Sequence, residues 1–395
     1  MERTLEPNPP VEAPPLRQRL FFVDNLRWTV ILLVISMHAA DTYSPLGSWY
    51  FTDRAPLSTA ELLTFALWQT YLQSFFMGLL FFLSGFFVPA SFDRKGPAKF
   101  LRERAFRLGL PVLFYMFVLG PITEYFCAHS WNSTEPTSFA NEWIKHIRNG
   151  EFLQENGPLW FCLALLIFCL IYVAFRSARP PSHNTDDSGQ PPRTSQLIVF
   201  ALTLTAFSSL VRLPFPSGLS FLNMHLSDFP QYILLFAVGI VAARRDWLPK
   251  LSYSLGIRWL AIVLPAGFLL WLALAYIKVS APFGNIPLHS FRGSLLSVGF
   301  NLWESFTCVA ICYGLLVLFR KTYNHQGRLE KFFSDNAFSV YVFHPPIVIL
   351  AARLLHPLTA PPLAKFVLLT TIATVVTYAL SAAVFRRIPW LRNIL

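Results

Sequence analysis

Residues 62–92 read LLTFALWQTYLQSFFMGLLFFLSGFFVPASF and contain no charged side chain. A run of this kind is typical of a transmembrane helix, because about 20 apolar residues cross a ~30 Å hydrocarbon core. At about 1.5 Å per residue, however, this run is too long for one upright crossing. We therefore expect the helix to tilt, to extend beyond the membrane, or to break near Ser84–Gly85 or Pro89.

The rest of the chain has the same character. Of its 395 residues, 54% are hydrophobic and only 13% are charged, whereas soluble domains carry roughly 25% charged residues. The sequence therefore predicts an all-α, polytopic membrane protein with about ten transmembrane helices. The apolar segments are approximately 27–44, 61–90, 108–127, 158–175, 195–211, 229–243, 257–278, 295–319, 336–355 and 363–385.

The basic residues orient these helices. If the N-terminus is cytosolic, 24 of the 32 Lys and Arg residues fall on the cytosolic side and 8 on the other. Cytosolic loops of membrane proteins carry such an excess of positive charge. We therefore expect both termini in the cytosol. The net charge of +11 is then a topology signal, and we expect no nucleic-acid partner.

Few segments are polar. Residues 1–19 are Pro-rich without the apolar core of a signal peptide, so we expect a disordered cytosolic tail before a transmembrane domain at 20–395. Within that domain, 176–194 is a Pro/Ser-rich linker on the cytosolic side. The loop 128–157 faces the other side, and whether its Asn132 is glycosylated stays open. The five cysteines lie in or beside apolar segments without a CxxC pattern, so we expect no disulfide framework and no metal site.

Two ionisable residues lie in the first apolar helix, FFVDNLRWTVILLVISMHAADTYSP (21–45). Arg27 and His38 are eleven positions apart, which is within ~20° of three full turns and a rise of about 16 Å. They therefore share one helix face, Arg27 near the cytosolic surface and His38 deep in the membrane. Ionisable residues at such depth indicate a functional site. Taken singly, however, an arginine there is more often a topology anchor and a histidine a packing residue.

Further motifs accompany this pair. Residues 80–111 combine Ser84-Gly85-Phe86 with Arg104, Arg107 and Pro111, and the blocks GPLWF (157–161) and FSVYVFHPP (338–346) follow. With the Arg-X10-His spacing, these motifs resemble the acyltransferase-3 family of integral-membrane acyltransferases over nearly the whole chain. DNLRW…HAADTYSP and the block that begins SGFF are most similar to the branch named for glucan biosynthesis protein C.

The resemblance implies transfer of an acyl group from a cytosolic acyl-CoA, a co-substrate and not a bound cofactor, to a hydroxyl across the membrane. Guanidinium groups bind phosphates in bidentate fashion, so the candidates for the donor site are Arg27, Arg102, Arg104 and Arg107. The alternative explanation for the arginines at 102–107 is that they only mark the cytosolic side of the membrane.

His38 is the candidate general base, because imidazole titrates near neutral pH. Asp41 lies one turn further on and is a candidate partner for the ring. There is no G-x-S-x-G motif to suggest an acyl-serine intermediate. We therefore expect direct transfer, with Ser84 as a helix-end or packing hydroxyl.

Other residues are candidates for the acceptor site or its support. His344 precedes Pro345-Pro346, which we expect to break the helix, and its alternative role is to bond a carbonyl that the prolines leave free. Trp160 is a sugar-stacking residue or an interface anchor. Glu304 and Glu124 lie within apolar runs, and each either pairs with an arginine or touches the acceptor.

The sequence leaves several alternatives open. The acyl group is acetyl or succinyl, and the acceptor is a glycan or a lipophilic small molecule. The membrane is the plasma membrane, or an endomembrane in a eukaryote, and the oligomeric state is open. A transporter or exporter of an anionic metabolite competes with the enzyme, although internal repeats are absent. A scaffold without catalysis is a third class, which would tolerate loss of Arg27 and His38.

Overall fold

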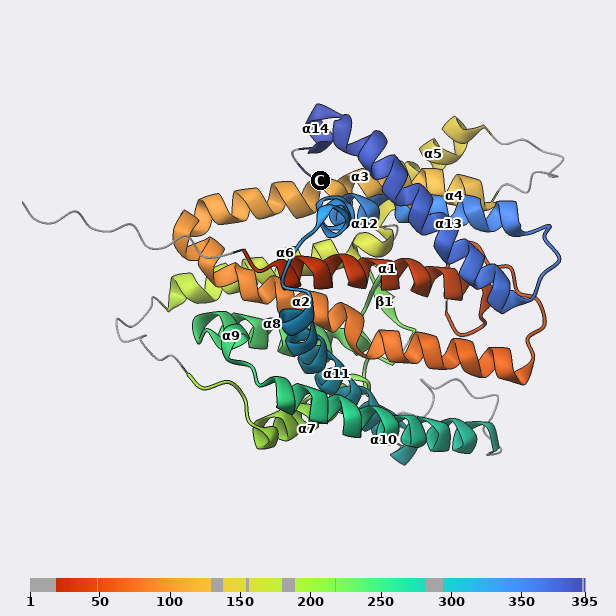
Figure 1. Ribbon diagram of the computed structural model, residues 1–395. Coiled ribbons are helices and arrows are strands. Elements are labelled where there is room, and N and C mark those ends of the chain that lie inside the picture. The colour runs from red at the N-terminus through yellow and green to blue at the C-terminus, as the bar shows by residue number, and fades with distance from the viewer. Residues whose placement is uncertain are drawn as a thin grey trace, which may run out of the picture.

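Long helices lying side by side build the protein in the computed structural model (Figure 1). The predicted tail, apart from Arg19, lies outside the described residues, as do Asn132 and residues 180–188 of the linker. The described residues are 19–47, 49–128, 138–153, 156–179, 189–216, 218–280, 294–392 and 394.

Helices account for almost all of the regular structure, as the sequence predicts. In chain order the elements are α1 (Phe21–Tyr43), α2 (Thr59–Arg104), η1 (Ala105–Gly109), α3 (Leu110–Phe114), η2 (Tyr115–Leu119), α4 (Gly120–Ala128), α5 (Phe139–Arg148), η3 (Glu151–Leu153), η4 (Gly157–Leu159), α6 (Trp160–Ala178), α7 (Thr194–Val211), β1 (Ser220–Phe221), β2 (Met224–His225), η5 (Leu226–Asp228), α8 (Phe229–Arg244), α9 (Trp247–Lys250), α10 (Tyr253–Ser280), α11 (Leu295–Thr322), α12 (Arg328–Leu355), α13 (Pro362–Ala383), η7 (Phe385–Arg387) and α14 (Pro389–Arg392).

Nine helical stretches among the described residues are long and apolar enough to cross a membrane. One of them, Thr59–Tyr125, contains two arms, because the chain reverses direction at Gly96. Figure 1 shows α2 running one way and its continuation through α3 and α4 running back. Counting both arms gives the ten crossings predicted from the sequence. The chain is therefore an all-α, multi-pass membrane protein.

Of the three alternatives expected for the long charge-free run, the break near Ser84–Gly85 or Pro89 is wrong. Both of those sites lie inside continuous helix, and the chain leaves helical geometry at Gly96, with φ 72° and ψ 169°. Glycine adopts positive φ without the steric cost that a Cβ atom imposes. The charged run 93–95 directly precedes the turn. The first arm thus extends beyond its charge-free segment before the chain turns back.

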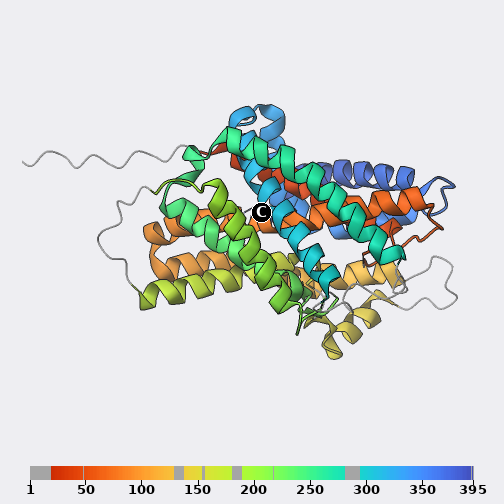
Figure 2. The same cartoon turned by 90° about the horizontal axis from the view of Figure 1, so that it is seen from below.

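The core of the bundle depends on close helix packing. At the crossing of α2 and α8, a Cβ atom on Gly85 would clash with the carbonyl of Phe236, and one on Gly239 with the carbonyl of Phe82. Small residues permit such backbone approach between membrane helices. α1 packs against α2, α11, α12 and α13. In contrast, α10 crosses the front of the view in Figure 2 (teal) and buries little of its surface.

A short hairpin precedes α8. β1 pairs antiparallel with β2, and the turn residues Leu222 and Asn223 have φ of 50° and 56°. Side-chain amides tie this turn to the start of α6, because Asn156 donates to the carbonyl of Leu222 at 2.7 Å and Asn223 to that of Gly157 at 2.9 Å. The sequence did not predict this hairpin, since its turn lacks the glycine that usually marks two-residue turns.

Four of the five cysteines lie buried and free, as packing residues would: Cys162, Cys169, Cys308 and Cys312.

Candidate active site

His38 lies in the second half of α1, and the carboxylate of Asp41 connects it to α2. Its Nδ1 atom is 3.4 Å from Oδ2 of Asp41, one helical turn further on. The other carboxylate oxygen accepts a 2.7 Å hydrogen bond from Nε2 of Gln69 in α2. Asp41 is therefore held by a second helix. With the proton of the ring on Nδ1, directed at Asp41, the Nε2 atom of His38 is free to accept another.

The segment after α1 folds back over this pair. Trp49 stacks on His38 with ring centroids 3.8 Å apart and planes at 16°. Gly47 allows the close return, because a Cβ atom there would collide with the carboxylate of Asp41. The imidazole is thus restricted both by a partner at Nδ1 and by an aromatic ring against its face.

His344 lies beside His38, with ring centroids 5.3 Å apart, and is completely buried. Its Nδ1 atom is 2.8 Å from the carbonyl oxygen of Tyr341. In a regular helix the amide of residue 345 would bond that oxygen, but Pro345 has no N–H. The imidazole supplies the missing donor. The expected break at Pro345 and Pro346 is therefore wrong. The helix α12 runs without interruption from Arg328 to Leu355.

The GPLWF block reaches the same region. The hydroxyl of Tyr341 donates to the carbonyl of Pro158. Gly157 has φ 48° and sits against the ring of Tyr115, where a Cβ atom would clash. Trp160 lies among aromatic side chains, 5.5 Å from the ring centroid of Tyr232. Tertiary folding thus places the block at 338–346 between the block at 157–161, which Tyr341 contacts, and His38, which His344 contacts.

Arginines gather about the other end of α1. The Arg27 side chain is 39% exposed, lies 3.7 Å from Oδ1 of Asp24, and has its guanidinium 4.7 Å from the ring centroid of Phe87. Arg104 and Arg107 lie close enough for their charges to act on it. We call Arg27, Arg104 and Arg107 the arginine cluster. The candidate Arg102 is exposed on α2, two residues before Arg104.

Glu304 pairs with an arginine, which was one of its two predicted alternatives. Its Oε2 atom is 2.7 Å from Nη1 of Arg212, whose Nη2 is 3.2 Å from Asp228. Burial alone would lower the pKa of Arg212, but the two carboxylates outweigh it and raise that pKa above its ordinary value. Arg212 therefore stays charged and holds together the end of α7 and the beginnings of α8 and α11.

For two other residues the structure excludes one of the predicted alternatives, which leaves Ser84 as a packing hydroxyl. Ser84 lies in the interior of α2, partly buried beside Gly85, and not at a helix end, because the helix continues to the turn at Gly96. Glu124 contacts a histidine and not an arginine: its Oε2 is 3.0 Å from Nδ1 of His146.

Sequence reasoning missed Gln69, Trp49 and His146. Gln69 had a usable signal, since it is a polar amide in an otherwise charge-free run. Trp49 and His146 lie in polar connecting segments, where nothing in the sequence indicates their partners.

Comparison with known families identifies the class of protein. A family model described as an acyltransferase domain matches residues 20–386. The chain belongs to the acyltransferase-3 family. It is therefore an integral, multi-pass membrane enzyme that transfers an acyl group from a donor to an acceptor. The predicted family is confirmed, and the enzyme class is preferred over the transporter and scaffold alternatives.

Two relatives with the same name show the extent of the similarity. The glucans biosynthesis protein C of Shigella dysenteriae serotype 1 (strain Sd197) is 22% identical over 348 residues, which cover 86% of this chain and 85% of that protein. The protein of the same name from Escherichia coli O9:H4 (strain HS) has the same identity and coverage. No solved structure matches the chain significantly.

Proposed function

We propose that this membrane enzyme transfers an acyl group from cytosolic acyl-CoA to a hydroxyl of a glucan on the opposite side, with His38 as the general base. One observation carries the proposal: His38 has an acidic partner, Asp41, which Gln69 of another helix holds in turn. A base oriented by a fixed third group is the arrangement that activates hydroxyl nucleophiles in acyl transfer.

The proposed reaction is a direct displacement. The acceptor hydroxyl oxygen attacks the thioester carbonyl carbon while Nε2 of His38 takes the hydroxyl proton. The tetrahedral intermediate collapses, the C–S bond breaks, and the CoA thiolate leaves. It accepts the proton from the His38 imidazolium, which restores the neutral base. Asp41 stabilises the imidazolium formed in the first step, as the acidic member of a triad does.

The arginine cluster suits the donor. A CoA carries phosphates that cannot enter the hydrocarbon core, so they must bind at a cationic surface on the cytosolic side. Arg27 meets this need at one end of α1, and His38 lies about 16 Å along the same helix. The pantetheine arm spans this distance in the proposed complex and presents the thioester to His38.

The acceptor is the less constrained partner. The names of the relatives support a glucan, and Trp49 beside His38 offers an aromatic face of the kind on which sugar rings stack. The acyl group is acetyl or succinyl, which are the two groups expected from the sequence.

The test uses purified protein in detergent, with acetyl-CoA or succinyl-CoA and a glucan oligosaccharide. We expect release of free CoA thiol with one of the donors, and a glucan whose mass rises by the corresponding acyl group. Purified His38→Ala protein should show neither, whereas His225→Ala, which alters an exposed histidine, should behave as wild type. Wild-type protein that consumes neither thioester would contradict the proposal. Acylation of a lipophilic small molecule in place of the glucan would contradict the proposed acceptor.

A further inference from the structure

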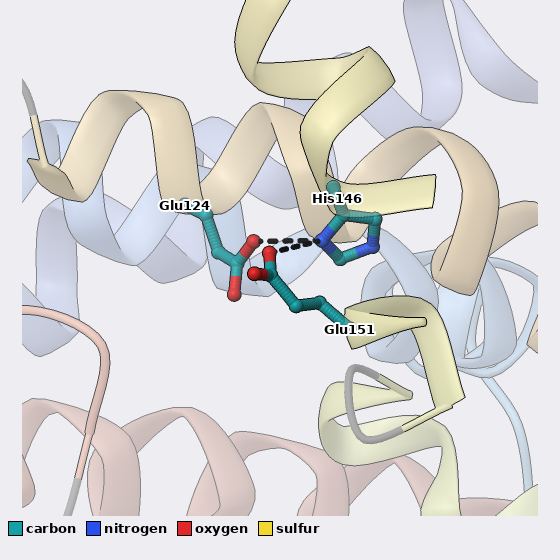
Figure 3. Close-up of side chains that lie close together, drawn as sticks. All are labelled: Glu124, His146 and Glu151. Atoms are coloured by element: carbon teal, nitrogen blue, oxygen red, sulfur yellow. Dashed lines mark ion pairs between the residues drawn. The ribbon is translucent and has the colours of Figure 1, made fainter. Parts of the chain in front are cut away.

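Three side chains from separate elements meet outside the active site. Figure 3 shows Glu124 of α4, His146 of α5 and Glu151 of η3 directed toward one another. Nδ1 of His146 is 3.0 Å from Oε2 of Glu124 and 3.7 Å from Oε2 of Glu151. Histidine, cysteine, aspartate and glutamate are the usual metal ligands. Within the part of the chain that the structure describes, this is the one group of three or more of them whose ligand atoms all lie within 4.8 Å of one another.

The histidine shows what this cluster lacks. Its Nε2 atom is 3.3 Å from the carbonyl oxygen of Met116, and because a carbonyl only accepts, Nε2 carries the hydrogen. In the neutral ring Nδ1 then presents a lone pair. The His146 side chain is only 2% exposed, and its Nδ1 has no hydrogen-bond partner among the described residues. A lone pair thus faces two carboxylates, an arrangement of three acceptors that calls for a cation.

We propose that Glu124, His146 and Glu151 bind a divalent transition-metal ion, with Zn²⁺ as the best fit. Bonds of about 2.0–2.1 Å in a tetrahedral zinc site place neighbouring ligand atoms about 3.3 Å apart, and the two measured separations of 3.0 Å and 3.7 Å lie on either side of this value. The imidazole favours zinc over Mg²⁺ and Ca²⁺, which prefer oxygen ligands alone.

The surroundings support a built site. The carbonyl of Met116 fixes the ring of His146, as outer partners of metal-bound histidines do. The amide of Asn149 donates to Oε1 of Glu151 at 2.9 Å and leaves the other oxygen for the ion. Both glutamates are partly exposed, 36% for Glu124 and 44% for Glu151, so an ion can enter from solvent and keep a water ligand.

The ion would join α4, α5 and η3 on the predicted non-cytosolic side. Besides this cluster, a 2.8 Å hydrogen bond from the indole of Trp143 to the carbonyl of Phe117 connects α5 to η2. η2 also carries Tyr115, whose hydroxyl lies 3.3 Å from that of Tyr50, next to Trp49 in the active-site segment. Metal binding would therefore stabilise α5 and η2, and through Tyr115 the segment that carries Tyr50 and Trp49.

The experiment uses the full chain purified in detergent with a tag free of histidine, stripped with EDTA and dialysed. Zinc bound per chain is measured by elemental analysis after titration with ZnCl₂, and the melting temperature is followed in parallel. We expect one tightly bound zinc and a higher melting temperature for wild type. We expect Glu124→Gln, His146→Gln and Glu151→Gln each to lower the affinity at least 100-fold and to lose the thermal shift.

His225→Gln and Asp335→Asn are the controls, because the first alters an exposed side chain and the second a partly exposed one, and both lie outside the cluster. They should bind zinc as wild type does. The two Gln variants of the partly exposed glutamates keep the side-chain shape, so they test the site even if the buried His146→Gln fails to fold. A wild-type chain that binds no zinc would identify the cluster as an imidazolium paired with carboxylates and overturn the proposal. Zinc binding that survives all three substitutions would also overturn it.

Discussion

The two ends of α1 hold their candidate functional residues in different ways. His38 is restrained by Asp41 at one ring nitrogen and by Trp49 against its face. Arg27 lies 3.7 Å from the carboxylate of Asp24, and its guanidinium lies 4.7 Å from the ring centroid of Phe87. More than a third of its side chain is exposed. Proton transfer requires a base in a fixed position, whereas capture of a phosphate needs charge and access. This difference is what the proposed roles require, with His38 as the base and Arg27 as a donor-binding residue.

The largest expected effect belongs to the restrained end. His38→Ala should lower kcat by about 10²–10⁴-fold, the usual contribution of a general base. Steady-state acyl transfer measures it, and His225→Ala provides the matched control. Normal membrane insertion should accompany the loss, since the substitution removes no topology signal. Activity within tenfold of wild type would remove His38 from the catalytic role.

Asp41→Asn should lower kcat less, by about tenfold to a hundredfold, which corresponds to the 1.5–3 kcal/mol of a charge-assisted hydrogen bond. The amide keeps the size of the side chain and can still contact Gln69, but it no longer stabilises an imidazolium. The KM values for both substrates should stay near wild type. If instead only a KM changes, Asp41 binds substrate and does not position the base.

The exposed end should respond in binding and not in chemistry. Arg27→Lys and Arg104→Lys keep the positive charge but lose the bidentate guanidinium. We expect the KM for acyl-CoA to rise by roughly tenfold to a hundredfold, with the KM for the acceptor and kcat nearly unchanged. Arg258→Lys alters an exposed arginine elsewhere on the predicted cytosolic side and should have no effect. An unchanged donor KM would leave the arginines as topology anchors only.

The smallest effect on activity is expected of a topology probe. Lys95→Cys lies beside the turn at Gly96, and an activity near wild type is expected, since Lys95 lies outside the catalytic site. A membrane-impermeant thiol reagent should label this cysteine from the cytosolic side only. Labelling from the opposite side alone would show that the predicted topology is inverted. The arginine cluster would then face away from cytosolic CoA.

Several properties could be predicted from sequence because they depend on neighbouring residues along the chain. Long charge-free segments determine that the chain crosses a membrane about ten times. Motif spacing identified the family, including the Arg27–His38 interval. The reversal lies within the predicted loop between 61–90 and 108–127, but the break expected near Ser84–Gly85 or Pro89 is absent. α2 stays helical through Pro89, and Gly96, which adopts positive φ, lies beyond the apolar run.

Only the tertiary structure decided which side chains meet. Nothing in the sequence connects Gln69 to Asp41, Arg212 to Glu304, or His146 to Glu124, since each pair spans different helices. Such pairing depends on how each helix is rotated and where it crosses its neighbours. In a membrane protein the hydropathy pattern does not encode that rotation, because lipid-facing and core-facing surfaces are similarly apolar. The sequence by itself therefore determined the helices and the family, and packing between the helices determined the site.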